Sequence, residues 1–311
     1  MNMITFWEIE NSVSKIADFK SGCWVNVKVP NSEEIEFLKE DLNIPEDFIH
    51  DVLDIDELPR IEIDGNNSYV ILRVPLSNQS NGVPYITVPM GIAITPKGTV
   101  TICSQRNEVI SQLFKMATVQ KIQLGNSVND VLWLFFISAS WYLQFLKEIN
   151  SHTSLIEKDL EYATKNEELH KLLHMEKCLV YFITSIKGNE MILEKIRTKK
   201  YIPFANFSVD LMEDVAIEIK QTLEMAKVYS DIQKEMMNAF SSIISNNLNV
   251  VMKQLTSVTI VLMIPTLIAS LYGMNVSNHF EKSPYAFYAI LLISAVLTLI
   301  GIFLFKRKNW I

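Results

Sequence analysis

Cysteine is scarce in this sequence, and the few that occur form no recognisable pattern. Cys23, Cys103 and Cys178 lie far apart, and no Cys-x-x-Cys pair or Cys/His spacing accompanies them. An odd number of dispersed cysteines argues against a disulfide framework and against a metal site built from thiolates. We therefore expect reduced thiols that face the cytoplasm.

Other signals are missing too, and each absence excludes a class of protein. The N-terminal segment has no basic region followed by an apolar core, so we expect no cleavable signal peptide. The net charge of -7 argues against nucleic acid as a partner, because phosphate binding requires a basic surface. The GxGxxG, GxxxxGK[ST], HExxH and GxSxG motifs are absent, which predicts a protein that is not an enzyme. His170 and His174 share a helix face, but no cysteine or carboxylate cluster completes a zinc site, so we interpret them as a solvated or packed pair.

Charge is missing from two long stretches near the C-terminal end. Although 20% of the chain is charged, no Asp, Glu, Lys or Arg occurs between Lys253 and Glu281 or between Lys282 and Lys306. Each stretch exceeds the roughly 20 apolar residues that a helix needs to cross a bilayer. We therefore predict two membrane-spanning helices.

The N-terminal third of the chain carries the signals of a mixed α/β unit. Runs of β-branched and aromatic residues alternate with turn sequences, and two short segments carry helix signals. Ser32 is the expected N-cap of the first short helix, and Pro45 opens the second. The pattern predicts a small mixed sheet with flanking helices. The expected strands are residues 4–9, 24–29, 60–63, 69–74, 85–95 and 99–103.

After about residue 107 the apolar spacing becomes helical and stays so. One of these helices contains the very apolar run Val131–Leu146, which we interpret as buried because 16 residues between charged positions are short for a membrane span. No Pro or Gly occurs between Pro203 and Pro265, so we predict one continuous helix over about residues 208–272. This helix would carry the chain from the cytoplasm into the bilayer.

The end of the chain predicts its orientation. Lys306, Arg307, Lys308 and Trp310 follow the second apolar stretch, and Lys253 precedes the first one. Because cytoplasmic segments hold an excess of Lys and Arg, all of these residues are expected on the cytoplasmic side. Both termini would then be cytoplasmic, and only a short loop between the spans would emerge outside.

The first membrane helix carries a stripe of polar, small and thioether residues, whereas the intervening positions are aliphatic. Spacing of about 3.5 residues keeps one face turned toward a common axis over many turns. Such a face serves tight packing between membrane helices, or it lines a pore in a symmetric oligomer, and the pattern alone leaves both interpretations open. The stripe consists of Asn249, Met252, Thr256, Thr259, Met263, Thr266, Ser270 and Gly273.

These residues resemble a known family. Two C-terminal spans, the first ending in Tyr272-Gly273-Met274-Asn275 and the second in a basic tail, look like the CorA family of magnesium channels. The resemblance covers the layout of the whole chain and implies a homopentameric funnel with an α/β cytoplasmic domain, a long stalk helix and two transmembrane helices. It implies pore and selectivity roles for Gly273, Met274, Asn275, Thr266, Met263, Thr259, Leu255, Met252 and Asn249.

The resemblance also implies an ion and a mode of control. Mg²⁺, with Co²⁺ or Ni²⁺ as further ions, would enter the cell down the electrochemical gradient, and Mg²⁺ bound between cytoplasmic domains would close the pore. Asp214 would be the sensing carboxylate of the stalk helix and Asp64 its partner, although both also fit solvated surface acids. The acidic residues Asp51, Asp54, Asp56 and Glu57 are explained more simply by solvation.

Two alternatives remain open at this point. One is a related transporter of another divalent metal, either a Zn²⁺ exporter or a Co²⁺ or Ni²⁺ uptake protein. The other is a membrane-anchored signalling or scaffold protein, in which the stripe would be purely structural.

The sequence thus predicts a multi-pass protein of the cell membrane that assembles as a homopentamer and binds divalent cations. Its expected segments are an α/β domain with long helices at residues 1–200, a stalk at 201–254, membrane helices at 255–272 and 285–305, an outer loop at 273–284, and a basic tail at 306–311.

Overall fold

The computed structural model describes residues 4–9, 13–78, 82–120, 122, 124–125, 127–160, 166–198, 207–274, 284–308 and 310. The chain divides into two compact units, residues 1–235 and residues 236–311. We call them the sheet unit and the helix-pair unit.

The sheet unit is built on a seven-stranded mixed sheet in the order β2-β1-β3-β7-β6-β5-β4. Strands β3 and β7 pair in parallel, and the other neighbouring strands pair antiparallel. The predicted strands are all present with small shifts at their ends. The strands are β1 (Ile4–Glu8), β2 (Ser14–Ile16), β3 (Trp24–Lys28), β4 (Arg60–Asp64), β5 (Asn67–Ser77), β6 (Tyr85–Thr95) and β7 (Gly98–Cys103).

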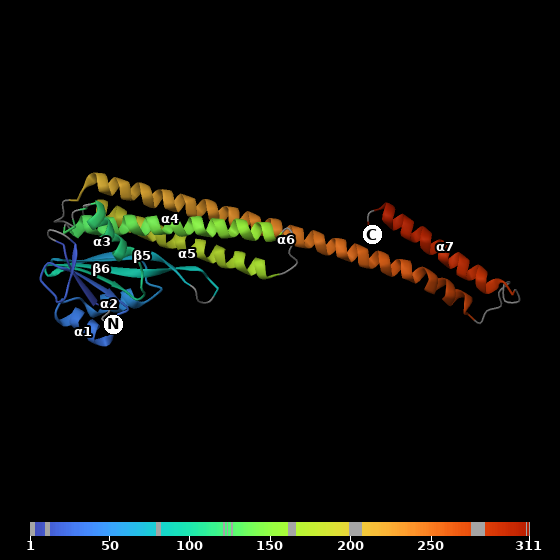
Figure 1. The fold of residues 1–311 in the computed structure, drawn as a ribbon, viewed down its shortest axis with the longest axis horizontal. Coiled ribbons are helices and arrows are strands. Elements are labelled where there is room, and N and C mark those ends of the chain that lie inside the picture. Colours follow the sequence, from blue (N-terminus) through green and yellow to red (C-terminus); the bar gives the residue numbers. More distant parts are fainter. Residues whose placement is uncertain are drawn as a thin grey trace. The chain divides into compact units, whose positions relative to one another are not determined.

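Two short helices, α1 (Ser32–Glu40) and α2 (Glu46–Leu53), cover one face of the sheet (Figure 1). The predicted N-cap of α1 was one residue off. Asn31, not Ser32, accepts a hydrogen bond from the Glu34 backbone N–H, and the Glu34 side chain accepts one from the Asn31 backbone N–H. Only Asn31 stands three residues before a glutamate that can close this reciprocal capping box.

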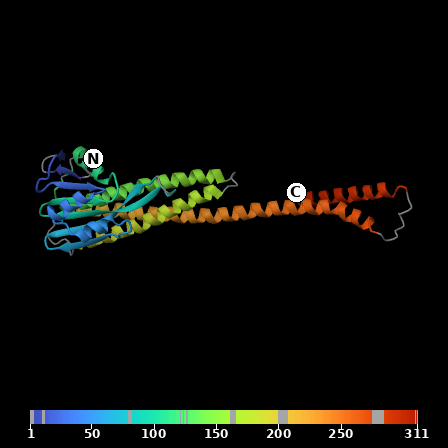
Figure 2. The same cartoon turned by 90° about the horizontal axis from the view of Figure 1, so that it is seen from below.

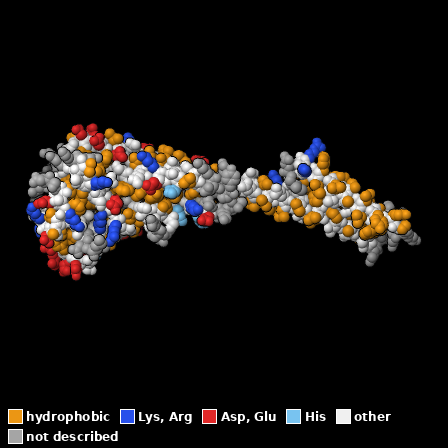
Figure 3. Space-filling view, in the orientation of Figure 1, with side chains coloured by type: hydrophobic (Ala, Val, Ile, Leu, Met, Phe, Trp, Pro, Cys, Tyr) orange, Lys and Arg blue, Asp and Glu red, His pale blue; other side chains and the backbone are white. Residues whose placement is uncertain are grey.

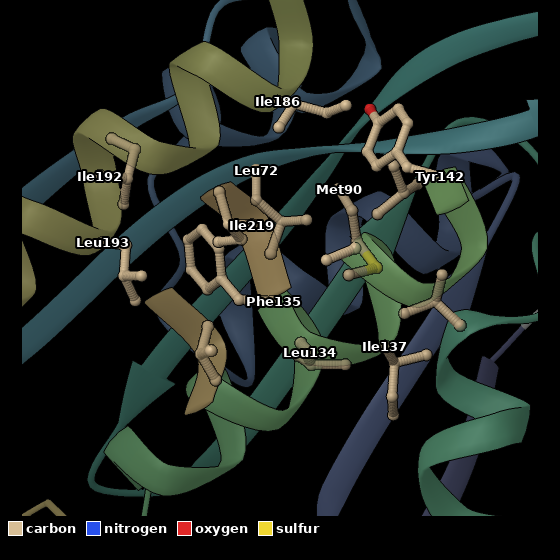
Figure 4. Close-up of a cluster of buried hydrophobic side chains, with 14 of the residues drawn as sticks. Leu72, Met90, Leu134, Phe135, Ile137, Tyr142, Ile186, Ile192, Leu193 and Ile219 are labelled. Carbon is tan, nitrogen blue, oxygen red and sulfur yellow. The ribbon is translucent and has the colours of Figure 1, made fainter. Parts of the chain in front are cut away.

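The opposite face is covered by α3 (Val109–Gln120), α4 (Ser127–Leu160), α5 (Asn166–Arg197) and the first part of α6 (Val209–Tyr272). Figure 4 shows side chains from the sheet, such as Leu72 and Met90, meeting Phe135 of α4 and Ile219 of α6. The apolar run of α4 lies in this core, because most of its side chains are buried by the sheet unit itself. The interpretation of this run as a buried helix is therefore confirmed.

A side chain of α5 joins the helical layer to the sheet beyond the first residue of β4. Arg73 of β5 lies beyond the last β4 partner, and its backbone N–H donates to Asn189 Oδ1 at 2.9 Å. The Asn189 Nδ2 group donates in return to the Arg73 carbonyl at 2.7 Å. Asn189 on α5 thus supplies both hydrogen bonds that a neighbouring strand would otherwise supply.

The helix-pair unit contains the later part of α6 and the helix α7 (Ala286–Arg307), which run side by side (Figures 1 and 2). Both helices are long and apolar enough to span a membrane. Figure 3 shows hydrophobic side chains over the surface of this unit and Lys and Arg side chains near the end of α7. The prediction of one uninterrupted helix up to Tyr272 is confirmed, with Pro265 inside it.

Candidate functional site

One side of α6 packs against α7 in the helix-pair unit. Ser257 is fully buried, and Val261 is only 9% exposed. A Cβ atom at Gly301 of α7 would lie 3.1 Å from Ile264 Cδ1 and 3.9 Å from Val261 Cγ2. Gly301 therefore allows the two helices to approach closely, as small residues do between membrane helices. The sequence analysis did not identify this contact, although a glycine inside an apolar span is a signal for it.

Toward the Tyr272 end of α6, a cavity of about 300 Å³ lies between the two helices. Pro265, Ile268 and Tyr272 of α6 line this cavity together with Ile290 and Ser294 of α7. The same side of α6 therefore faces α7 along the whole length of the pair.

The polar stripe lies on the other side of α6. At about 100° per residue, Thr259, Met263 and Thr266 lie within about 40° of the stripe's centre line, whereas Val261 and Ile268 lie roughly opposite to it. The stripe residues are all exposed in the single chain. They are Asn249, Met252, Thr256, Thr259, Met263, Thr266, Ser270 and Gly273.

Leu255 belongs to the same face. It is 60% exposed and lies about 40° from Thr259 around the helix axis. Leu255 is therefore close to the stripe around the helix, although it is not one of the stripe residues. Further along α6, Met263, Thr266 and Ser270 border a surface groove of about 510 Å³.

The hydroxyl groups of this face are oriented by their own helix. Thr259 Oγ1 donates to the Leu255 carbonyl at 2.8 Å, and Thr266 Oγ1 donates to the Leu262 carbonyl at 3.1 Å. Because each hydroxyl uses its single proton for this bond, its lone pairs remain available as acceptors. The waters around a metal cation present their hydrogen atoms outward, so such acceptors match a hydrated cation.

The helix ends at Tyr272, and Gly273 donates its backbone N–H to the Ala269 carbonyl at 2.9 Å. Met274 is 55% exposed. Asn275, the third member of the predicted outer motif, lies outside the described residues, as do residues 276–283 of the predicted outer loop.

The two predicted sensing carboxylates lie in the sheet unit. Asp214 is on the first part of α6, and Asp64 is the last residue of β4, where it pairs with Asn67. Both side chains are exposed. Within the described residues, no group of three or more His, Cys, Asp or Glu side chains could hold a metal ion, so a site at these positions would require ligands from elsewhere.

The acidic segment before β4 is held by arginines. The Arg60 guanidinium forms ion pairs with Asp51 and Glu57, and a third one with Glu62 at 2.7 Å. Arg73 donates to the backbone carbonyl of Glu57 at 2.6 Å. These contacts give Asp51 and Glu57 a structural role in addition to the solvation that we expected.

The two histidines differ in their surroundings. His170 is exposed, whereas a Cβ atom at Gly82 would lie 2.6 Å from the His174 ring. His174 therefore packs against the loop before β6.

A comparison with known proteins decides the family. The model of the family described as "CorA-like Mg2+ transporter protein" matches residues 19–307, which is most of the chain. The chain belongs to the CorA family. As a member of a family of transporters it is not an enzyme, and its two apolar helices are candidate membrane spans, as expected for a membrane protein.

Individual relatives agree with this assignment. The cobalt/magnesium transport protein CorA of Methanocaldococcus jannaschii is 27% identical over 93% of this chain and 91% of its own length. The protein of the same description from Thermotoga maritima is 20% identical over 96% of this chain and 86% of its own length. The complete structure of the CorA magnesium transporter from M. jannaschii matches with a TM-score of 0.83, covering 100% of this chain and 99% of that one at 24% identity. The fold class predicted from the sequence, a small mixed sheet with flanking helices, a long helix and two candidate membrane helices, is thereby confirmed.

Proposed function

We propose that this chain forms a homopentameric Mg²⁺ channel in which α6 lines the pore and α7 surrounds it. The observation that carries the proposal is the position of the polar stripe on the side of α6 that faces away from α7. Had the stripe served only to pack the two helices of one chain, it would face α7. Two helices cannot enclose a channel, so a pore lined by this stripe requires several copies around an axis.

The stripe suits an ion that keeps its water. Mg²⁺ demands octahedral geometry and dehydrates reluctantly, so it is commonly held through its water shell. The acceptor lone pairs of Thr259 and Thr266 would receive hydrogen bonds from those waters. No carboxylate occurs on the stripe, which favours weak binding and release, as conduction requires.

The two ends of the stripe would contribute amides. Asn275 and the Gly273 carbonyl at the outer mouth would hold the hydrated ion as it enters, with Met274 beside them. Asn249 would repeat the arrangement at the inner end. Between them, exposed Met252, Leu255 and Met263 would form hydrophobic rings that oppose passage by dewetting when they tighten.

The basic residues at the end of α7 favour one orientation of the chain in the membrane, and the membrane potential would then drive influx. Lys306 and Arg307 end α7, and such basic residues favour the cytoplasmic side. Both termini would then lie in the cytoplasm of a cell membrane. An inside-negative potential contributes about 2.3 kcal/mol per charge per 100 mV, so influx of a divalent cation needs no nucleotide hydrolysis.

Control by internal Mg²⁺ would act through Asp214, with Asp64 as a weaker candidate partner. Both carboxylates are exposed in the single chain, so a neighbouring copy could bring further ligands to them. Carboxylates from adjacent copies repel until a cation bridges them, and binding would therefore favour one packing of the subunits over another.

Co²⁺ and Ni²⁺ are further candidate ions, and the names of two relatives include cobalt. An alternative is that the chain transports another divalent metal, by Zn²⁺ efflux or by Co²⁺ or Ni²⁺ uptake. The intact Gly273-Met274-Asn275 sequence favours Mg²⁺ over the Zn²⁺ exporters, whose loops depart from it in this superfamily.

Ion flux into proteoliposomes tests the proposal directly. Mg²⁺, Co²⁺, Ni²⁺ and Zn²⁺ are supplied separately, with an inside-negative potential and with or without a proton gradient. We expect Mg²⁺ influx that follows the potential. Absence of flux for all four ions would overturn the channel proposal, whereas proton-dependent Zn²⁺ flux would favour the alternative transporter.

A further inference from the structure

A large cleft opens at the β2 edge of the sheet, and its lining residues all belong to the sheet unit. Its volume is about 890 Å³, which lies in the range of small-molecule binding sites. Strands β1, β2 and β3 contribute to its lining, together with residues around the starts of α1 and α3.

The floor of the cleft is polar and ordered. Thr5 pairs with Asn26 across β1 and β3, so both side chains lie on one face of the sheet. Asn26 is 7% exposed, and its Oδ1 accepts a hydrogen bond from Thr101 Oγ1 at 3.2 Å. Among the described residues no acceptor is found for its amide NH₂ group, and this group is not one of the fully buried unpaired atoms. The amide therefore offers a donor that a ligand in the cleft can reach.

Three cations from three separate segments line the same cleft. They are Lys15 of β2, Lys28 of β3 and Arg106, which precedes α3. Lys28 Nζ donates to the Asn107 carbonyl at 2.9 Å, which fixes its ammonium and leaves two of its three N–H groups for another acceptor. The carboxylates in the lining are Glu33 and Glu34, and Glu34 accepts hydrogen bonds from the backbone N–H groups of Ile4 and Asn31.

The charges of the lining side chains favour an anionic ligand. The lining carries three cations and two carboxylates, and one of these carboxylates is already engaged by backbone donors. A divalent cation would be repelled by Lys15, Lys28 and Arg106. An anion with several oxygen acceptors would accept hydrogen bonds from the ammonium and amide donors, and the positive charge of the guanidinium would attract it.

Aromatic side chains border the same space. Trp7 pairs with Lys15 across β1 and β2, so the indole and the ammonium lie on one face. The indole is held by Phe114, whose ring centroid lies 4.5 Å away, and by a hydrogen bond from Nε1 to Thr5 Oγ1 at 3.3 Å. Phe6 and Phe37 also line the cleft, but they pack against each other on the other face of the sheet. A flat aromatic surface beside cations, as Trp7 provides next to Lys15, is the combination that binds a base and its phosphates.

We propose that this cleft binds a nucleoside phosphate, with Lys15, Lys28 and Arg106 on the phosphate groups and the Asn26 amide as a further donor. The site is separate from the proposed pore and from Asp214 and Asp64. It would give the sheet unit a ligand of its own, and it does not depend on which ion the chain transports.

Titration calorimetry on the full-length protein in detergent tests the site, with ATP, AMP, adenosine and inorganic phosphate as separate probes. The buffer contains EDTA and no divalent cation, so that chelation by ATP contributes no heat. We expect saturable binding of ATP and AMP, no saturable binding of adenosine, and at least tenfold weaker binding of inorganic phosphate. Absence of saturable ATP and AMP binding would overturn the proposal, and inorganic phosphate binding as tightly as ATP would overturn its nucleoside part.

Variants locate the binding. Lys15→Gln combined with Arg106→Gln changes two exposed side chains, and we expect it to weaken ATP binding at least tenfold, with a melting curve to check that the variant is folded. Lys177→Gln is the matched control, because Lys177 is an exposed lysine on α5 outside the cleft. Asn26→Ala provides a second, uncharged test with the same expected direction. ATP binding that survives in both the double variant and Asn26→Ala would overturn the assignment to this cleft.

Discussion

Two apolar helical segments in this chain have opposite surroundings. Residues 131–146 of α4 are mostly buried by the sheet and by neighbouring helices of the same unit. Residues 256–272 of α6 are mostly exposed, and α7 covers only one side of them. The apolar side chains of the first segment are buried within a single chain, whereas those of the second can be buried only by partners outside the chain. Lipid and further copies of the chain are the partners that we propose.

The strongest test of this contrast concerns transport, which we assign to the exposed segment. Replacing Asn275 by Ala removes the amide that would hold the hydrated ion at the outer mouth, so we expect Mg²⁺ uptake to be abolished. Uptake is measured in proteoliposomes, and the oligomer is checked by size-exclusion chromatography. Normal uptake by an intact Asn275→Ala oligomer would remove the outer motif from the mechanism.

A matched pair of leucines tests the difference in burial. Leu134 of α4 is fully buried, and Leu271 of α6 is 62% exposed. Leu134→Ala leaves a cavity and is expected to lower the free energy of unfolding by about 2–5 kcal/mol, whereas Leu271→Ala should change it by less than about 0.5 kcal/mol. Denaturant titration of the full chain in detergent measures both changes. Equal losses would mean that neighbouring copies of the chain bury Leu271 as tightly as the sheet unit buries Leu134.

A third test uses Asp130, a buried acid at the start of α4 whose titration should make stability depend on pH. Asp130 is fully buried, accepts the Gly125 backbone N–H at 3.2 Å, and has its pKa raised by burial to about 7. Because the folded state holds this proton more tightly than the unfolded state does, the contribution of Asp130 to stability is greatest below about pH 4 and falls as the pH rises toward 7. We expect this loss to be about 1.4 kcal/mol per pH unit in that window.

The matched variant for this prediction is Asp130→Asn, which retains an oxygen acceptor for Gly125 but cannot ionise. Its free energy of unfolding, measured between pH 5 and pH 7, should lack the slope that Asp130 contributes. Parallel profiles for the wild type and the variant would show that Asp130 does not titrate in this range.

The smallest expected effect concerns regulation. Asp214→Ala removes an exposed carboxylate from the sheet-unit part of α6. If this carboxylate senses internal Mg²⁺, several-fold more Mg²⁺ should be needed inside proteoliposomes to inhibit influx. Glu218→Ala, one turn further along the same helix, is a matched control. If internal Mg²⁺ inhibits the Asp214→Ala variant as it inhibits the wild type, Asp214 is a solvated surface acid without a sensing role.

Most elements were predictable because local signals agreed with the fold. β6 has the predicted bounds, since its β-branched residues lie between two clear turns. β2 was missed because a three-residue edge strand with two exposed positions carries no alternating pattern. The N-cap of α1 was misplaced because Asn31 and Ser32 are both good caps, and only the position of Glu34 distinguishes them.

The site was predictable in part. The spacing along α6 identified its polar face, but the side taken by α7 depends on tertiary packing around Gly301. The cleft at the β2 edge had no sequence signal. Lys15, Lys28 and Arg106 are far apart in the chain, and only the pairing of β1 with β2 and β3, and of β3 with β7, brings their segments together.

The hydrogen bonds between Asn189 and Arg73 have a further consequence. Most amides inside the sheet are protected from exchange with deuterium by a neighbouring strand, so they become exposed when strands separate. The Arg73 amide is instead protected by a side chain of α5. Its exchange rate would therefore report the separation of the helical layer from the sheet, independently of any opening between strands.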